Sequence, residues 1–217
     1  MKLSAMVGDV LFPGKCVLCR QVLEAGETDL CRECRADAPE FSQGKLKLQF
    51  IDSFAAVWYY KENVRLALHR FKFRRGSHLA EPFGRLMAMK LLQELPADLD
   101  AVTWVPISTL RRLFRGYDQD ELLARTVARE LGLPCRKLLK KVRHNRPQSG
   151  IEGHAKRRAN VLGVYRLAEG AEVAGQRILL VDDILTTGAT AGECARVLLT
   201  AGAKEIHCAV VAAARNK

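Results

Sequence analysis

The sequence lacks the features of a membrane-embedded or secreted protein. None of its 217 residues belongs to an apolar run that approaches the length of a membrane span. Residues 1–12 contain neither a long apolar core nor a small-residue cleavage site, so we expect no secretory signal. Internal repeats and low-complexity segments are also missing. With 48% hydrophobic and 27% charged residues, the composition predicts a cytoplasmic globular protein with one sizeable core and a small appendage.

Two common phosphate-binding motifs are absent as well. The sequence contains no GxxxxGK[ST], and its most prominent strand-to-helix turn lacks the spacing GxGxxG. Acidic residues are in the minority, at 24 against 35 lysines and arginines, which gives a net charge of +11. Such a balance favours an anionic partner, either a highly phosphorylated small molecule, a nucleic acid or both. Composition alone does not choose between them.

One stretch, residues 177–202, nevertheless has a phosphate-binding pattern. The apolar residues 178–181 predict a strand buried on both faces, and Cys194, Val197, Leu198 and Ala201 recur at helical spacing before Gly202. Between them lie two carboxylates, Asp182 and Asp183, and the hydroxyl-rich turn Thr186, Thr187, Gly188, Ala189, Thr190. Such a turn presents free N–H groups to a phosphate, supported by about +0.5 charge from the helix dipole, while the carboxylates suit vicinal sugar hydroxyls. The pattern indicates a ribose 5-phosphate site; the alternative is an acidic strand end with an ordinary polar turn.

The seven cysteines fall into two groups, and their odd number argues against a closed set of disulfides. Cys16, Cys19, Cys31 and Cys34 form a CxxC-x11-CxxC array that can close tetrahedrally on zinc. Because all four positions are filled by protein, the predicted zinc is structural; redox-active or unpaired cysteines are the alternative. The other three cysteines lie in apolar segments and are predicted to be buried thiols.

The remaining segments predict a doubly wound α/β domain with a mainly parallel sheet, which follows a small zinc domain. We place the zinc domain at residues 1–45 and the α/β domain at 46–217. Strands are expected at 54–60, 101–105, 161–167 and 206–213, in addition to the strand at 178–181. Helices are expected from residue 63, at 79–95 with Phe83, Leu86, Met87, Leu91 and Leu92 buried, and at 120–131.

Three basic segments surround the predicted site. Residues 106–119 follow a strand. The small loop Pro106-Ile107-Ser108 exposes backbone N–H groups from its non-proline residues, and together with Arg111, Arg112 and Arg115 it is predicted to bind a pyrophosphate. Residues 136–158 contain Pro147, Gly150 and Gly153 and predict a mobile loop, which either closes over a polyphosphate or is a solvated surface. Residues 69–75 interleave cations with Phe71 and Phe73, which either contact nucleic acid or turn their rings to the core while the cations face water.

These motifs together carry a resemblance to known families. The segment VDDILTTGAT at 181–190 resembles the signature of the type I phosphoribosyltransferases, which bind phosphoribosyl pyrophosphate. Nearly the whole chain is similar to the ComF family of competence-related phosphoribosyltransferase-like proteins. That family combines a CxxC pair of pairs, a VPxxxxRxxxRGFNQ-like segment, an arginine loop with Gln ending in RxxN, and the VDDxxTTGxT loop. In this sequence the VPxxxxRxxxRGFNQ-like segment corresponds to residues 105–119, and the arginine loop corresponds to Gln148, Arg157 and Asn160.

The resemblance implies binding of phosphoribosyl pyrophosphate with Mg²⁺ and possible transfer of the phosphoribosyl group to an unidentified nitrogen nucleophile. Asp182 and Asp183 would hold the ribose hydroxyls and face the developing positive charge, and residues 186–190 would anchor the 5-phosphate. The pyrophosphate would be neutralised by Mg²⁺ and the arginines of 106–119, and Gln148 and Arg157 count among the ligand-binding residues. We also expect residues 59–75 to line part of the acceptor pocket.

The chain departs from the family pattern at three positions, and the resemblance also suggests a second function. Tyr117 and Asp118 replace Phe and Asn, and Asn145 replaces Thr. The change to Asp removes an amide donor and adds negative charge beside the pyrophosphate loop. The alternative function is a non-catalytic protein that binds single-stranded DNA, acts with DNA-uptake proteins and uses the site as a metabolite sensor. No residue stands out as a general base.

Overall fold

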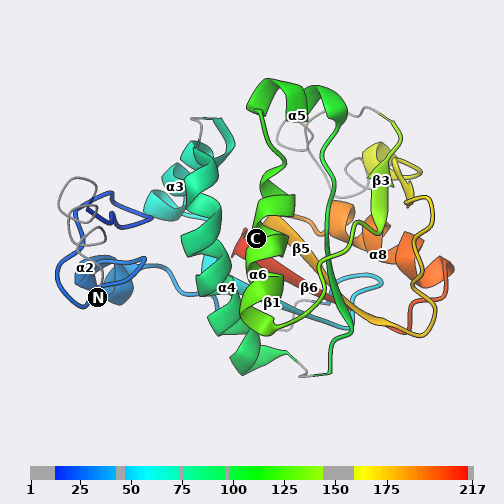
Figure 1. The fold of residues 1–217 in the computed structure, drawn as a ribbon, viewed down its shortest axis with the longest axis horizontal. Coiled ribbons are helices and arrows are strands. Elements are labelled where there is room, and N and C mark those ends of the chain that lie inside the picture. The colour runs from blue at the N-terminus through cyan, green and yellow to red at the C-terminus, as the bar shows by residue number, and fades with distance from the viewer. Residues whose placement is uncertain (1–12, 43–46, 74–75, 96–97, 144–158, 215–217) are drawn as a thin grey trace, which may run out of the picture.

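A four-stranded parallel sheet lies at the centre of the computed structural model, which describes residues 13–42, 47–73, 76–95, 98–143 and 159–214. Its strands follow the order β1-β6-β5-β2 (Figure 1). Their bounds are Ser53–Tyr59 for β1, Ala101–Trp104 for β2, Arg177–Leu185 for β5 and Glu205–Ala213 for β6. The predicted parallel α/β architecture is confirmed.

Strand β5 is an inner strand, between β6 and β2. Leu179 packs into the core on one face of the sheet, whereas Ile178 and Leu180 pack into the core on the other. A strand covered on both faces has a continuous apolar sequence, which is why residues 178–181 identify it. The strand continues beyond this run to Leu185, so the two carboxylates lie within it rather than after it.

Helices cover both faces of the sheet. Those on one face are α3 (Glu62–Phe73), α4 (Ala80–Glu94) and α6 (Gln119–Leu131), and the other face carries α8 (Ala189–Thr200). Helices α4 and α6 pack against each other and against the sheet, and Phe71, Phe83 and Leu123 fill the core beneath them. Cys194 and Leu198 of α8 fill the core on the opposite side. None of the helices in the described ranges is long and apolar enough to cross a membrane.

Two helical side chains differ from the prediction. Leu92 is 75% exposed, because the buried stripe of α4 runs through Phe83, Met87 and Leu91, and the next residue lies about 100° further around the helix. Phe73 is 52% exposed at the end of α3, whereas Phe71 is fully buried as expected. The basic and aromatic segment therefore places only one of its two phenyl rings in the core.

A small second sheet replaces part of the predicted loop and strand. Strand β3 (Leu139–Lys141) pairs antiparallel with β4 (Tyr165–Leu167). The loop predicted for 136–158 was therefore wrong at its beginning, and the strand predicted for 161–167 is confined to its last three residues. Burial of Leu139 and Tyr165 against α8 and its neighbours explains the pairing. The rest of the predicted loop, including Asn145, Gln148 and Arg157, lies outside the described residues.

The cysteine module, which we define as residues 13–42, packs onto the α/β domain beside α3 and α4 (Figure 1). It contains one short helix, α2 (Arg32–Asp37), capped by the Cys31 side chain. Val17 and Leu18 belong to the same core cluster as Phe71. The Phe41 N–H also donates to the Val57 carbonyl of β1 at 3.0 Å. The module therefore shares a hydrophobic core with the larger domain.

Candidate functional site

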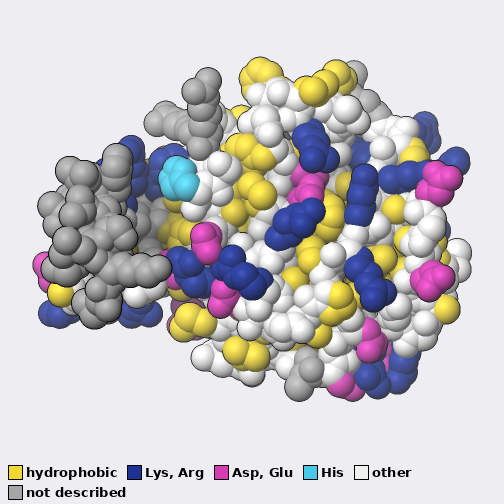
Figure 2. Space-filling model, in the orientation of Figure 1, with side chains coloured by type: hydrophobic (Ala, Val, Ile, Leu, Met, Phe, Trp, Pro, Cys, Tyr) yellow, Lys and Arg dark blue, Asp and Glu magenta, His cyan; other side chains and the backbone are white. Residues whose placement is uncertain are grey.

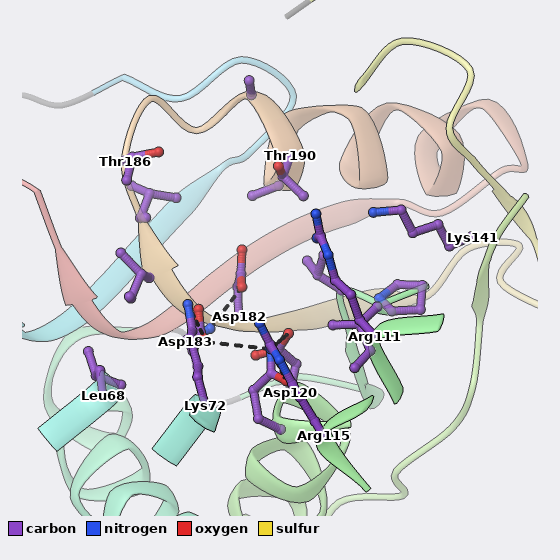
Figure 3. Close-up of a pocket in the computed structure, with 18 of the residues that line it drawn as sticks. Leu68, Lys72, Arg111, Arg115, Asp120, Lys141, Asp182, Asp183, Thr186 and Thr190 are labelled. Carbon is purple, nitrogen blue, oxygen red and sulfur yellow. Dashed lines mark hydrogen bonds and ion pairs between the residues drawn. The ribbon is translucent and has the colours of Figure 1, made fainter. Parts of the chain in front are cut away.

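A pocket of about 820 Å³ opens at the carboxyl ends of β2 and β5 (Figure 3). Its walls come from α3, from the loop after β2 and helix α5 (Thr109–Arg115), from β3, and from the turn into α8. Ligands of open α/β sheets bind at this edge. The structure brings these predicted site residues into the lining: Pro106, Ile107, Arg111, Arg115, Asp182, Asp183, Thr186, Thr187, Gly188, Ala189 and Thr190.

The turn into α8 has the geometry of an anion site. Gly188 is the N-cap residue with a φ of 74°, in the left-handed region that favours glycine. Thr186 and Thr190 are partly exposed and line the pocket. The first N–H groups of a helix have no partners inside the helix, and the helix dipole favours negative charge there. The turn can therefore hold a phosphate group with backbone donors and threonine hydroxyls.

The two adjacent carboxylates point to opposite faces of β5, as successive strand residues do. Asp182 points toward the threonine turn, and Asp183 points toward α3 (Figure 3). Burial, followed by the charge of Asp183, raises the pKa of Asp182 to about 7. The two carboxylates therefore differ in environment, and Asp182 is the one that faces the turn.

Asp183 is bound by a lysine that the sequence analysis did not select. Lys72 of α3 places its Nζ 2.9 Å from Asp183 Oδ2, and both side chains line the pocket. Burial alone would lower the pKa of Lys72, but Asp183 and the nearby carboxylates outweigh it and raise that pKa. The only sequence signal was its place in the basic segment 69–75, where a solvent-facing lysine was the simpler interpretation.

A third carboxylate, Asp120 of α6, lies in the same cluster. Asp120, Asp182 and Asp183 each offer an oxygen within 4.8 Å of the others. Gln119 Nε2 donates to Asp120 Oδ2 at 3.1 Å and to Asp183 Oδ2 at 3.5 Å. Burial, followed by repulsion from Asp183, raises the pKa of Asp120 well above its ordinary value. No sequence signal pointed to Asp120, because an acidic residue in the first turn of a helix is ordinary.

Helix α5, which follows the loop after β2, contributes two of the three predicted arginines to the pocket. Arg111 and Arg115 line the pocket, and Arg115 Nη1 donates to Gln119 Oε1 at 2.7 Å. Arg112 points elsewhere, 3.9 Å from Glu121, and is not part of the lining that the described residues form. Ser108 is also outside that lining, because its hydroxyl caps α5 by accepting from the Arg111 N–H at 3.4 Å.

Asp118, one of the departures from the family pattern, holds this loop in place. Its Oδ2 accepts from the Ile107 N–H at 3.2 Å, and its Oδ1 accepts from the N–H groups of Asp120 and Glu121 at 3.1 and 3.3 Å. Both oxygens are thus used as acceptors, whereas an Asn would offer one oxygen and one donor. Asp118 therefore connects the loop to the start of α6 through both carboxylate oxygens.

A second lysine that sequence reasoning missed faces Arg111. Lys141 of β3 lines the pocket, with its Nζ 3.5 Å from the Tyr165 hydroxyl. Burial, followed by the charge of Arg111, lowers the pKa of Lys141 to about 8. The pocket therefore has a carboxylate cluster on one side and two partly buried cations, Arg111 and Lys141, on the other (Figure 3).

The four cysteines of the CxxC pairs converge on one point. Their sulfurs all lie within 4.8 Å of one another, and Cys19 Sγ is 3.6 Å from Cys31 Sγ. Tetrahedral zinc with bonds of about 2.3 Å requires sulfurs about 3.8 Å apart, so the residues fit this ion. The geometry supports structural zinc.

Comparison with known proteins gives the class of protein that this fold and site define. A phosphoribosyl transferase domain matches residues 121–217, and a double zinc ribbon domain matches residues 7–45. The chain therefore combines a phosphoribosyltransferase-type α/β domain with a zinc ribbon. The first match includes the threonine turn and both strand carboxylates, whereas Lys72, Arg111 and Arg115 lie before it.

Relatives along nearly the whole chain confirm the resemblance to the ComF family. Competence protein F of Haemophilus influenzae is 27% identical over 90% of this chain and 95% of the relative. DNA utilization protein YhgH of Escherichia coli O157:H7 is 28% identical over the same shares. Among solved structures, the phosphoribosylpyrophosphate amidotransferase of B. subtilis is 28% identical, with a TM-score of 0.42 over 62% of this chain and 27% of that enzyme.

Proposed function

We propose that this protein binds phosphoribosyl pyrophosphate with Mg²⁺ and transfers the phosphoribosyl group to a nitrogen nucleophile. The observation that carries the proposal is that one pocket is lined by a phosphate-type turn, a strand carboxylate and several partly buried cations. The 5-phosphate would bind at residues 186–190 and the ribose hydroxyls at Asp182. The pyrophosphate would lie between Arg111, Arg115 and Lys141. The diphosphate carries more negative charge than the 5-phosphate, so the end of the pocket that holds these three cations favours the diphosphate.

The carboxylate cluster suggests how Mg²⁺ would enter the site. Lys72 already neutralises Asp183 at 2.9 Å, so the three carboxylates are a poor cage for a resident divalent ion. Mg²⁺ commonly binds through one or two carboxylates together with substrate phosphates. We therefore propose that it arrives with the pyrophosphate and is held beside Asp182. When bound, it would neutralise charge on the leaving pyrophosphate.

The proposed transfer requires positioning and charge stabilisation more than proton chemistry. The nitrogen lone pair forms a bond to the anomeric carbon as the bond to pyrophosphate breaks, pyrophosphate leaves with the electron pair, and the nitrogen loses its proton to water. Asp182 would face the positive charge that develops on the sugar, and the arginines would take the negative charge of the leaving group. An acceptor that is already nucleophilic needs no general base.

Calorimetric titration with phosphoribosyl pyrophosphate and Mg²⁺ tests this proposal. We expect saturable binding by the wild type and at least a tenfold weaker affinity for Asp182→Asn, which removes the carboxylate charge. Glu169→Gln is the matched control, because Glu169 is an exposed carboxylate outside the pocket lining. The proposal fails if the wild type does not bind, or if the control loses as much affinity as Asp182→Asn.

A second candidate function is binding of single-stranded nucleic acid at the pocket mouth. Phe114 is 85% exposed, and Arg115 lies 5.0 Å over the half-exposed Phe73 ring. Hydrophobic side chains gather over α5 (Figure 2), the helix that also carries Arg115. A surface that combines exposed rings with arginines can stack bases and pair with phosphates. Binding of this kind would weaken with salt with a slope of about −0.7 per neutralised phosphate. Oligonucleotide binding that is lost in Phe114→Ala, without turnover of any nitrogen acceptor, would favour this function.

The cellular role and domain boundaries are part of the same proposal. The relatives are named for competence and DNA utilization, which supports a role in DNA uptake or use. We propose that residues 1–45 form the zinc-binding unit and residues 46–217 the phosphoribosyltransferase-like unit. Limited proteolysis after zinc removal should cut first between residues 13 and 45 if these boundaries are right.

A further inference from the structure

Helix α3 contacts two sites that lie far apart in the sequence. At Arg70, the Nη2 group donates to the carbonyls of Val17 and Leu18 at 3.0 and 2.6 Å. At Lys72, the Nζ group forms the 2.9 Å ion pair with Asp183 in the pocket. Two residues along a helix differ by about 200° in direction, so the two side chains leave the helix on opposite sides. The helix therefore lies between the cysteine module and the pocket.

The carbonyls that accept from Arg70 belong to the metal-binding turn itself. Val17 and Leu18 are the two residues between Cys16 and Cys19, whose sulfurs belong to the four-cysteine cluster. Both side chains are buried in the core that also contains Phe71 of α3. A closed zinc site fixes the backbone of such a turn, because its ligands are bonded to one ion. The position of the Arg70 side chain therefore depends directly on the conformation of this turn.

A second connection holds the cysteine module against α4. Arg85 binds Asp29 through two hydrogen bonds, of 2.5 and 3.0 Å, and the Asp29 carbonyl accepts from the Val17 N–H at 2.8 Å. The paired geometry of a guanidinium and a carboxylate makes this contact specific. The turn at Val17 and Leu18 is thus held by α3 through Arg70 and by α4 through the Arg85–Asp29 pair. A shift of the cysteine module would therefore displace α3 together with the turn.

At its other end, α3 forms a wall of the pocket. Leu68, His69, Lys72 and Phe73 all line it, and Lys72 supplies the cation next to Asp183 and Asp120. Phe71 lies between the two polar contacts and is fully buried, so the helix cannot rotate about its axis without breaking the core. The position of Lys72 therefore depends on the position of the whole helix.

We propose that α3 transmits the structure of the zinc-bound cysteine module to the pocket, with Arg70 and Lys72 as positioning residues that hold Asp183 in place. Loss of zinc would release the turn at Val17 and Leu18, loosen α3 and withdraw Lys72 from Asp183. The effect on ligand affinity rests on the function proposed above. The effect on α3 does not, because it can be measured without any ligand.

Hydrogen–deuterium exchange of residues 62–73 tests the structural part. The samples are the zinc-loaded wild type, the wild type treated with a chelator, and Arg70→Leu. Arg65→Leu is the matched control, because Arg65 is an exposed arginine on the same helix. We expect at least tenfold faster exchange in α3 for the chelated protein and for Arg70→Leu, while exchange in β6 stays unchanged. Arg70→Leu and Arg65→Leu should both retain zinc. Unchanged exchange in α3 after zinc removal would overturn the proposal.

Affinity for phosphoribosyl pyrophosphate with Mg²⁺ tests the functional part. We expect Arg70→Leu to weaken binding about tenfold in the wild-type background and less than twofold in a Lys72→Met background, because both changes act through the same contact. Equal losses in the two backgrounds would contradict transmission through Lys72. If Arg70→Leu does not fold, Arg70→Lys keeps the charge and gives the same comparison. Absence of binding by the wild type would refute the proposed function, and the exchange result would still decide the role of α3.

Discussion

The Lys72–Asp183 ion pair gives the prediction with the most direct energetic content. Lys72→Met keeps the aliphatic stem of the side chain and removes its charge. The two charged atoms are 2.9 Å apart, and the Asp183 side chain is 5% exposed. At an effective dielectric constant of about 20, the gross attraction is about 6 kcal/mol, part of which is offset by desolvation. Removing one partner of such a pair typically costs about 3–5 kcal/mol, because the other charge is left buried.

Urea unfolding of four proteins measures this cost as a double-mutant cycle. The proteins are the wild type, Lys72→Met, Asp183→Leu and the double variant. We expect Lys72→Met to lower the free energy of unfolding by about 3 kcal/mol or more, and the double variant to lie within about 2 kcal/mol of the wild type. Lys47→Met is the control, because Lys47 is exposed, and it should change stability by less than about 0.5 kcal/mol.

Two results would refute this reasoning. A loss of less than about 1 kcal/mol for Lys72→Met would mean that the pair behaves as an exposed surface ion pair. A coupling energy near zero would mean that the two side chains act independently, so that Lys72 does not hold Asp183.

The remaining predictions concern pH, the threonine turn and zinc. Ligand affinity should be highest between pH 7 and 8, because Asp182 (pKa about 7) loses its negative charge below this window and Lys141 (pKa about 8) loses its positive charge above it. In calorimetry from pH 6 to 9, Lys141→Arg should abolish the decline in affinity at high pH. A flat profile for the wild type would contradict this assignment of the two groups. Gly188→Ala should weaken binding at least tenfold and cost about 1–2 kcal/mol in unfolding free energy, since its φ is 74° and the new Cβ would lie 2.7 Å from a leucine side chain. Gly170→Ala, with a φ of 70° and no described atom within 4 Å of the new Cβ, should show the backbone cost without the loss of binding. Cys34→Ser should lose zinc in metal analysis and become protease-sensitive within residues 13–42, whereas a cysteine-to-serine change outside the cluster should do neither.

The sequence was sufficient for features that depend on local pattern. A buried parallel strand needs a continuous apolar run, a phosphate-type turn needs glycine and hydroxyls at fixed positions, and a zinc site needs paired CxxC motifs. Each of these signals lies within a few consecutive residues. The strands of the main sheet and the convergence of the cysteines were therefore predictable.

Features that depend on long-range contacts were not predictable in the same way. Lys72 is 111 positions before Asp183, and nothing in a basic helix end distinguishes a paired lysine from a solvated one. The antiparallel pairing of β3 with β4 joins short strands whose burial comes from α8, so their own sequences are weak signals. Arg112 was grouped with Arg111 and Arg115 by spacing, but helix α5 turns it away from the pocket.

The net charge of +11 does not show where the basic side chains of the described residues lie. On the face formed by α4 and α6, basic and acidic side chains are intermixed (Figure 2), as in the 2.8 Å pairs Arg129–Glu81 and Arg125–Glu121. Surface pairs of this kind contribute little to stability, but they neutralise the local field. The partly buried cations that line the pocket are therefore a better guide to the anionic ligand than total charge.

Phosphorus NMR of phosphoribosyl pyrophosphate, titrated with the zinc-loaded protein and Mg²⁺, tests the central claim most directly. The ligand reports on both ends of the pocket, because its 5-phosphate and its diphosphate give separate resonances. The account predicts that all of these resonances shift together and saturate at the same protein concentration, and that Asp182→Asn weakens all of them in parallel. Shifts confined to the diphosphate, or none at all, would contradict a site in which the threonine turn and the arginines hold one ligand.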